Sequence, residues 1–322
     1  MVMAVVVAAV VIGRDNSSPR PPAAGRPVSP SDFKVATFNM FNGAFCPIET
    51  HLCLGRERVE MLVELLEGAG CPELVALQEA GPPQREHLPA ALAAACGGTY
   101  QPVWEPGPRE TAQVMVLSRL PVKEQGYLDL ANDPGEAVWV RVQSPLGELE
   151  LVAAHFAVGF ANPVCADSAC PPICSDRLTT NECHAVQVID FLDRGPASAV
   201  EVVAGDLNAE TRSSTVRTIE TAGFDDLWLL AEHPECGRST PTACTAGRRR
   251  PRTPLDGLDS PSGRHRRRID YVFARSNRCP LTPGAATLAA VPAEPPVAGL
   301  YWPSDHAGVV TGMRCGRSPS ER

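Results

Sequence analysis

The chain has 322 residues, of which 44% are hydrophobic, and a formal net charge of -8. A chain of this length and composition can bury a large core, either as two domains or as one large sandwich-type domain. The acidic balance excludes a protein that is basic over its whole surface, so affinity for nucleic acid would have to come from a local basic patch.

The N-terminal segment and the cysteines both point to export. Residues 1–12 are an apolar run, shorter than the ~20 residues that span a bilayer, which fits the apolar region of a signal peptide or a short anchor. The twelve cysteines are an even number, and disulfides persist in oxidising compartments. We therefore expect a secreted or cell-envelope protein, with residues 13–31 as a Pro- and Ser-rich linker and residues 32–316 as the folded domain.

Strand-like and helix-like patterns alternate after the linker. Short β-branched or alternating runs predict strands at residues 33–39, 74–77, 113–117, 137–142, 148–155, 200–204, 269–274 and 307–312. Apolar residues at helical spacing predict helices at residues 56–69, 84–95, 180–192 and 213–222. Hairpins mixed with helices predict an α/β fold, with two mixed sheets face to face and helices outside.

Polar side chains stand where several predicted strands end. Asp206 and Asn208 follow one buried strand, where an ionised carboxylate can accept a water proton and an amide can donate to a phosphoryl oxygen. Glu79 follows another strand, and a carboxylate in apolar surroundings is costly unless it is paired or binds a metal. Structural roles compete with these interpretations: an Asx turn for the first pair, and a helix cap or a surface acid for Glu79.

Two histidines belong to the same series. His306 follows Asp305 near the C-terminus, and a neighbouring strand carrying Asp270 would orient its imidazole as a general base. The alternative is an isolated Asp–His pair on the surface. His155 ends a long apolar strand, and taken by itself this position favours a structural core histidine.

Together these strand endings resemble the endonuclease/exonuclease/phosphatase superfamily of metal-dependent phosphoesterases over residues 34–312. The segments that carry the resemblance, in the family's order, are Thr37-Phe38-Asn39, Gln78-Glu79, Leu117-Ser118-Arg119-Leu120-Pro121, His155, Gln187, Gly205-Asp206-Leu207-Asn208, Arg268-Ile269-Asp270-Tyr271 and Ser304-Asp305-His306. The resemblance implies a four-layer α/β sandwich with the site at one end of its two sheets.

The resemblance also implies a metal site. Asn39 and Glu79, together with Asp305, would hold Mg²⁺, or Mn²⁺ in its place. The metal would act as a Lewis acid on a phosphoryl group that is attacked in line by water.

The resemblance further implies the catalytic roles. Asp206 and Asn208 would position the attacking water and the scissile phosphate. His306, oriented by Asp270, would act as base or as a phosphate-contacting cation, and His155 would contact the phosphate or assist the leaving group.

The chain departs from the known branches of this superfamily at two positions. Phe41 stands where members that repair abasic DNA carry an acid, which disfavours that function. In deoxyribonuclease-like members a carboxylate supports the histidine that corresponds to His155. In this chain only Glu110 could take that role, and its position in the sequence is shifted.

Cysteines gather between His155 and the Gln187 helix, as they do in secreted sphingomyelinase-like members. Their spacing favours disulfides over a zinc site, since no C-x-x-C pattern is present. The cysteines of this loop are Cys165, Cys170, Cys174 and Cys183, and the local pairs expected elsewhere are Cys46–Cys53 and Cys236–Cys244.

Two further features bear on the substrate. The loop 241–268 is rich in arginine and would attract a polyanion if it overhangs the site. An arginine-rich loop that only reflects overall composition is an equal alternative. Trp302 with Tyr301 is the only obvious apolar tip for a lipid surface.

These features predict an exported, Mg²⁺-dependent phosphodiesterase, with nucleic acid slightly favoured as substrate. The alternatives are a sphingomyelinase or phospholipase C-like activity and a phosphomonoesterase. A non-catalytic phosphoester-binding module is the alternative of another class. No protein partner is predicted, and we expect a monomer.

Overall fold

The computed structural model describes residues 33–41, 54–104, 113–131, 136–158, 165, 170–174, 179–247, 257–263 and 265–316. The expected signal segment and linker lie outside these ranges, as do Glu110 and the expected Cys46–Cys53 pair. Among the described residues, no helix combines the length and the apolar character that crossing a membrane requires.

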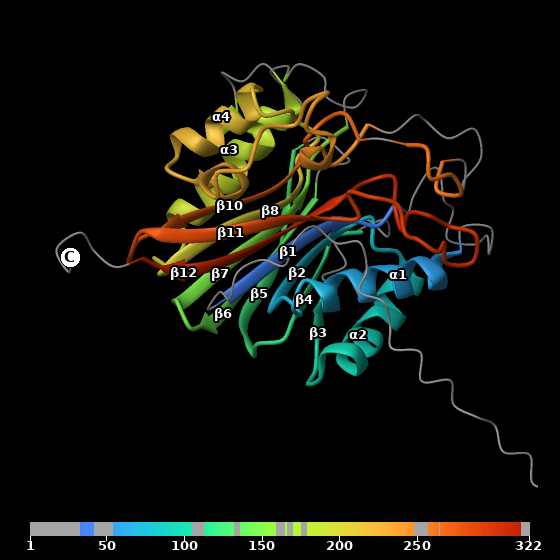
Figure 1. Cartoon of the computed structure of the whole chain (residues 1–322). Helices are drawn as coiled ribbons and strands as arrows, with labels where there is room; N and C mark the ends of the chain where they lie inside the picture. The colour runs from blue at the N-terminus through green and yellow to red at the C-terminus, as the bar shows by residue number, and fades with distance from the viewer. Residues whose placement is uncertain are drawn as a thin grey trace, which may run out of the picture.

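Two six-stranded mixed sheets form the centre of the fold (Figure 1). In spatial order the first sheet contains β11 (Leu281–Leu288), β12 (Gly308–Cys315), β1 (Phe33–Asn39), β2 (Leu74–Gln78), β4 (Met115–Ser118) and β3 (Gln101–Val103). The second contains β5 (Val122–Asp129), β6 (Glu136–Ser144), β7 (Gly147–His155), β8 (Val200–Asp206), β10 (Asp270–Ser276) and β9 (Asp225–Asp226).

Helices cover the outer face of each sheet, so the fold has four layers (Figure 1). The helices are α1 (Gly55–Gly68), α2 (Pro82–Cys96), α3 (Thr180–Arg194), α4 (Ser214–Thr221) and α5 (Leu227–Leu230), with short 3-10 turns at η3 (Pro172–Cys174) and η4 (Pro241–Ala243). α1 and α2 pack on the first sheet, and α3 and α4 pack on the second. The expected four-layer α/β sandwich is therefore confirmed.

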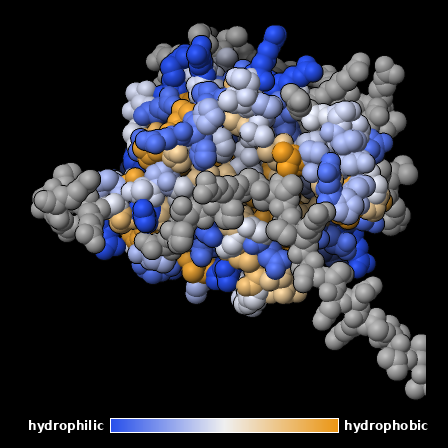
Figure 2. All heavy atoms as spheres, in the orientation of Figure 1, coloured by the Kyte–Doolittle hydropathy of each residue, from blue (hydrophilic) through white to orange (hydrophobic). Residues whose placement is uncertain are grey.

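The main core lies between the sheets and follows from the alternation of side chains along each strand. In β8, Val202 and Ala204 point into the inter-sheet core, whereas Val203 points outward against α3 and α4. The face of the molecule in Figure 2 is mainly hydrophilic, with hydrophobic residues in small scattered groups. Burial of both sheet faces leaves the strand ends as the places where polar groups can gather.

Each predicted strand and helix is present within a few residues of its expected bounds. The elements that were not predicted have weak patterns for physical reasons. β5 is an edge strand whose sequence is polar and partly exposed, and β11 contains a Pro-Gly pair that is typical of a turn.

Five disulfides are formed among the described residues. The expected Cys236–Cys244 pair is confirmed, and the cysteine loop after His155 forms Cys165–Cys170 and Cys174–Cys183. Cys71–Cys96 joins the ends of α1 and α2, and Cys279–Cys315 joins the ends of β10 and β12. None of the cysteines in the described ranges is free.

Candidate active site

Three of the expected side chains lie in one row across the second sheet. β7 runs parallel to β8 with His155 paired to Asp206, and β10 runs antiparallel to β8 with Asp270 paired to the same residue. Because side chains alternate between faces, Asp206 shares the inward face of Val202 and Ala204. The space between the sheets therefore changes from apolar to polar at this end of the sandwich.

The backbone around Asp206 leaves little freedom for other residues. Gly205 has φ 155°, and a Cβ atom there would lie 1.9 Å from the carbonyl oxygen of Ala154. Asn208 has φ 48°, in the left-handed region, and its side-chain nitrogen donates to the Phe156 carbonyl at 2.9 Å. This bond ties the turn to the end of β7 and so fixes the direction of the Asp206 carboxylate.

Asp206 lies between the two histidines. Its Oδ2 is 3.8 Å from Nε2 of His155 and 3.8 Å from Nε2 of His306. Its Oδ1 accepts the backbone N–H of Asn208 at 2.9 Å. A carboxylate in this position can accept a proton from a water molecule that approaches between the two imidazoles.

Asn39 reaches this row from the first sheet, where β1 packs against β8. Its side-chain nitrogen donates to Asp206 Oδ2 and to Glu79 Oε1, both at 3.0 Å, while its oxygen accepts the N–H of Phe41 at 3.0 Å. The Phe41 donor and the two carboxylate acceptors fix the orientation of the amide. This orientation lets Asn39 position both carboxylates, and the metal-ligand role implied by the resemblance stays a prediction.

The Asp270–His306 contact expected from the sequence is present. Nδ1 of His306 lies 3.1 Å from Oδ1 and 3.0 Å from Oδ2 of Asp270. The expectation that the two strands are neighbours in one sheet is wrong, because β10 and β12 belong to different sheets. The Asp270–His306 pair therefore forms between the two sheets of the sandwich, and not between neighbouring strands of one sheet.

The two histidines carry different charges. Burial alone would lower the pKa of His306, but Asp270, Asp206 and Asp305 outweigh burial and raise this pKa well above 6.5. Burial lowers the pKa of His155, and Asp206 only partly opposes the shift. At neutral pH the site therefore combines an imidazolium with a neutral imidazole.

His155 has a free hydrogen-bonding position. Within the described part of the chain its Nε2 is buried and has no hydrogen-bond partner. Glu136, which was not predicted, is paired with His155 across β6 and β7, and it accepts the Gln113 N–H at 2.9 Å. The hairpin predicted at residues 137–142 and 148–155, extended by one residue, would have placed this acid opposite His155.

Asp206, Asp270 and His306 offer possible metal-ligand atoms within 4.8 Å of one another, and Glu79 with Asp305 is a second set of acids that could hold a metal. Burial and the neighbouring Asp305 raise the pKa of Glu79 to about 8, and burial raises the pKa of Asp305 as well. Two partly buried carboxylates that repel each other are stabilised by a cation. Carboxylate oxygens are the ligands that Mg²⁺ and Mn²⁺ prefer, so the donor set fits a hard divalent ion.

Comparison with known proteins agrees with this geometry. Residues 36–306 match the endonuclease/exonuclease/phosphatase family. The chain belongs to this family. Membership makes it a metal-dependent phosphoric ester hydrolase, and the expectation of an enzyme is confirmed.

Solved structures with the same fold come from animals and bacteria. D. rerio TDP2 complexed with single strand DNA product matches with a TM-score of 0.58 and 17% identity, over 88% of this chain and 98% of that chain. A family protein from Bacteroides vulgatus matches with a TM-score of 0.58 and 16% identity, over 89% and 100%. One from Leptotrichia buccalis has a TM-score of 0.57 and 14% identity, over 88% and 99%. No match is found among curated proteins.

Sequence reasoning missed Asn181 and gave no role to Ser304, although both hold the site of this family member together. Asn181 in α3 donates to the carbonyls of Leu207 and Asn208 at 3.1 and 3.4 Å, which supports the turn after β8. Ser304 donates to the Asn39 carbonyl at 2.7 Å and accepts the His306 N–H at 3.1 Å. The sequence signal that could have identified Asn181 is its amide side chain in the first turn of the helix, close to the cap.

Sequence-based expectations about the substrate are corrected at Arg268 and Trp302, whereas Arg266 and Arg267 of the same loop are exposed. Arg268 does not belong to an exposed basic loop, because its guanidinium is buried against Asp226 at 2.7 Å and against Glu235. Trp302 is not an apolar tip, because it is 1% exposed and donates to the Ser260 carbonyl. The arginines at positions 248–250, 252 and 264 lie outside the described residues.

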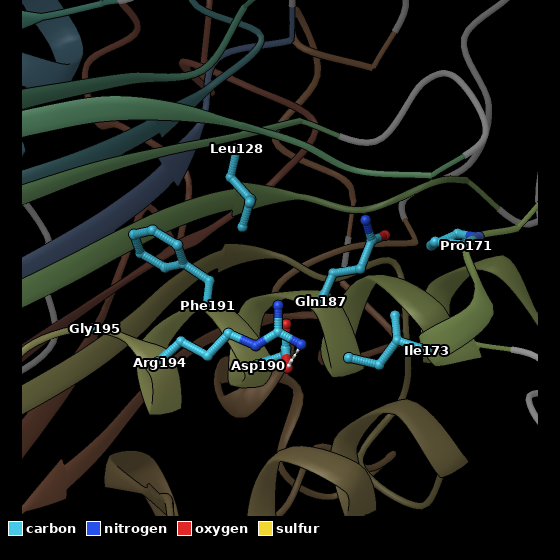
Figure 3. A pocket seen from close by; sticks show the side chains of 8 residues that line it. All are labelled: Leu128, Pro171, Ile173, Gln187, Asp190, Phe191, Arg194 and Gly195. Carbon is cyan, nitrogen blue, oxygen red and sulfur yellow. Dashed lines mark ion pairs between the residues drawn. The ribbon is translucent and has the colours of Figure 1, made fainter.

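An open hollow of about 420 Å³ lies away from this chemistry, between α3, the end of β5 and the η3 turn (Figure 3). It is lined by Leu128, Pro171, Ile173, Gln187, Asp190, Phe191, Arg194 and Gly195. None of the expected site residues lines it. Gln187, which helped to carry the resemblance, accepts the Ala131 N–H at 2.8 Å and has a structural role.

Proposed function

We propose that the protein is an exported, Mg²⁺-dependent phosphodiesterase. The observation that carries this proposal is Asp206, which lies between a neutral His155 and a charged His306 and is joined through Asn39 to Glu79. Disulfide bonding of the described cysteines supports export, since disulfides persist in oxidising compartments.

We assign each site residue a role that follows from its charge. Asp206 orients the attacking water and accepts its proton, while the His306 imidazolium, held by Asp270, faces the phosphoryl oxygens and stabilises their charge. His155 donates or accepts at the same phosphate through its unpartnered Nε2. Mg²⁺ held by Glu79 and Asp305 would supply Lewis acidity at the phosphoryl group.

Removal of divalent metal should abolish turnover. We expect hydrolysis of one or more of DNA, RNA, sphingomyelin and bis(p-nitrophenyl) phosphate by the oxidised protein with Mg²⁺, and none after EDTA treatment. Product release is measured for each substrate in both conditions, with Mg²⁺ added back as the control. Turnover that survives EDTA, or no turnover of any diester, would contradict the proposal.

Nucleic acid is the substrate that the exposed Trp104 and its neighbour Arg85 favour. Trp104 is 41% exposed, and the Arg85 guanidinium lies 4.1 Å from the centre of its ring. Burial lowers the pKa of Arg85, and the charge of Glu136, which is paired with His155 across β6 and β7, opposes this shift. An exposed aromatic ring with an arginine beside it can stack a base and attract a phosphate.

Trp104→Ala should therefore affect long substrates selectively. Stacking contributes about 1–3 kcal/mol per base, so we expect KM for a single-stranded oligonucleotide to rise about tenfold. The kcat for bis(p-nitrophenyl) phosphate should not change, because this small diester does not reach Trp104. Leu230→Ala, which truncates another exposed apolar side chain, serves as the control. Equal effects of Trp104→Ala on both substrates would contradict a stacking role and leave phospholipid as the stronger alternative.

A further inference from the structure

Thr245 is a buried threonine in the loop between η4 and β10, and its exposed fraction is 0%. Its Oγ1 accepts the backbone N–H groups of Ile269 and Asp270, both at 3.1 Å. Its carbonyl accepts the N–H of Ala307, the residue after His306, at 2.7 Å. Thr245 therefore binds the main chain at both members of the Asp270–His306 pair.

Strand pairing within the sheets does not fix the distance between Asp270 and His306. β10 begins at Asp270 in the second sheet, whereas β12 begins just after His306 in the first sheet. Ladder hydrogen bonds position strands only within their own sheet. β9 pairs with β10 at Phe273 and Ala274, farther along the strand, and the Asp270 N–H is bonded by Thr245 instead. A residue that binds both strand entries can fix the distance that the ladders leave open.

A disulfide closes the loop that leads to Thr245. Cys244, which directly precedes Thr245, is bonded to Cys236. Glu235, which directly precedes Cys236, binds the buried guanidinium of Arg268. Both ends of this loop thus contact the segment that enters β10, which holds the Thr245 hydroxyl in place against the strand.

We propose that Thr245, anchored by the Cys236–Cys244 disulfide, is a positioning residue that holds Asp270 and His306 together across the two sheets. Thr245 acts through Asp270, whose carboxylate orients the His306 imidazole. The inference rests on the proposed function, in which this imidazole faces the phosphoryl oxygens. A misplacement of about 1 Å in such a group can cost about a hundredfold in rate.

Thr245→Val keeps the size of the side chain but removes the acceptor of the two N–H groups. We expect kcat for bis(p-nitrophenyl) phosphate to fall about tenfold, with little change in KM, because the groups that contact substrate remain. Thr245→Ser keeps the acceptor and should restore kcat. Thr287→Val is the matched control, since it removes a buried hydroxyl that donates to the Thr242 carbonyl of the same loop at 3.0 Å. It should leave kcat unchanged.

A double-mutant cycle separates positioning from general destabilisation. If Thr245 acts through Asp270, Thr245→Val should cost little further kcat in the Asp270→Asn background, where the pair is already weakened. A merely structural role predicts the same tenfold loss in both backgrounds. Additive losses would therefore overturn the inference.

Proton NMR of the metal-free protein gives a readout that does not depend on turnover. The His306 Nδ1–H that is bonded to Asp270 should give a downfield resonance that is absent in Asp270→Asn. This resonance should persist in Thr245→Ser and Thr287→Val and be lost in Thr245→Val. Its persistence in Thr245→Val would overturn the inference, whereas absence of turnover by wild type would contradict only the proposed function.

The anchoring disulfide is tested separately, and this test decides if Thr245→Val does not fold. Cys236→Ala with Cys244→Ala leaves Thr245 intact, and it should lower kcat and weaken the His306 resonance. Removal of another disulfide by Cys71→Ala with Cys96→Ala should change neither quantity. An unchanged kcat and resonance without the Cys236–Cys244 bond would overturn the proposed anchoring.

Discussion

Glu79→Gln is expected to abolish measurable Mn²⁺ binding and to lower kcat/KM by about a thousandfold, the size of effect expected when Lewis-acid stabilisation worth several kcal/mol is lost. The substitution preserves the shape of the side chain and its contact with Asn39, but removes the negative charge that would hold the ion. Isothermal titration with Mn²⁺ and steady-state kinetics measure the two effects. Glu150→Gln, which neutralises a buried carboxylate beside Arg141, is the matched control.

The same substitution should change how stability depends on pH. The pKa of Glu79 is raised from 4.5 to about 8, so the fold favours the protonated carboxyl. An acid of this kind destabilises the metal-free protein increasingly as pH rises from about 4.5 to about 8. Glutamine does not ionise, so in EDTA the Tm of Glu79→Gln should exceed that of wild type by more at about pH 8 than at about pH 5. A constant Tm difference across this range, or unaltered Mn²⁺ binding, would contradict the assignment of Glu79.

The strand endings could be predicted because one local rule produces them. A run of alternating or apolar residues that stops at a polar residue, as before Asn39 and Asp206, predicts both a strand and a functional end. The order of these strand endings along the chain is the same as the order of the corresponding segments in the family. The candidate site residues of the second sheet were therefore predictable without any knowledge of tertiary contacts.

What the sequence could not predict depends on contacts between distant segments. The orientation of the Asn39 amide is set by Phe41, Glu79 and Asp206, and no local pattern encodes it. Arg58 lies beside the apolar positions of its helix, where an arginine normally reaches solvent. Only the packing of Met40 and Pro303 around the guanidinium reveals its position.

The same limit explains the two corrections about the substrate. Arg268 follows a run of arginines, but Asp226 on β9 draws it into the interior. Trp302 packs in a cluster with Leu258 and Leu300, formed by two loops that are far apart along the chain. Composition suggested exposure for both residues, whereas long-range pairing decided their burial.

Asp270→Asn is expected to lower kcat by about a hundredfold or more, which is within the usual contribution of general acid–base groups. Asp270 is the strongest of the charges that raise the pKa of His306 above 6.5, and burial without it would lower this pKa. The His306 imidazolium would then lose its proton at a lower pH. In a plot of kcat/KM against pH, the alkaline limb should therefore move to lower pH in the variant.

The pH profile also decides between the two roles that the resemblance allows for His306. If His306 acts as a phosphate-contacting cation it must be protonated, so loss of Asp270 moves the alkaline limb. If His306 acts as a general base it must be neutral, so loss of Asp270 moves the acid limb. Glu201→Gln makes the same carboxylate-to-amide change on β8, where Glu201 is bound to Arg275 at 2.7 Å, and should move neither limb. Movement of the acid limb alone in Asp270→Asn would contradict the imidazolium role. It would then assign the water proton to His306 instead of Asp206.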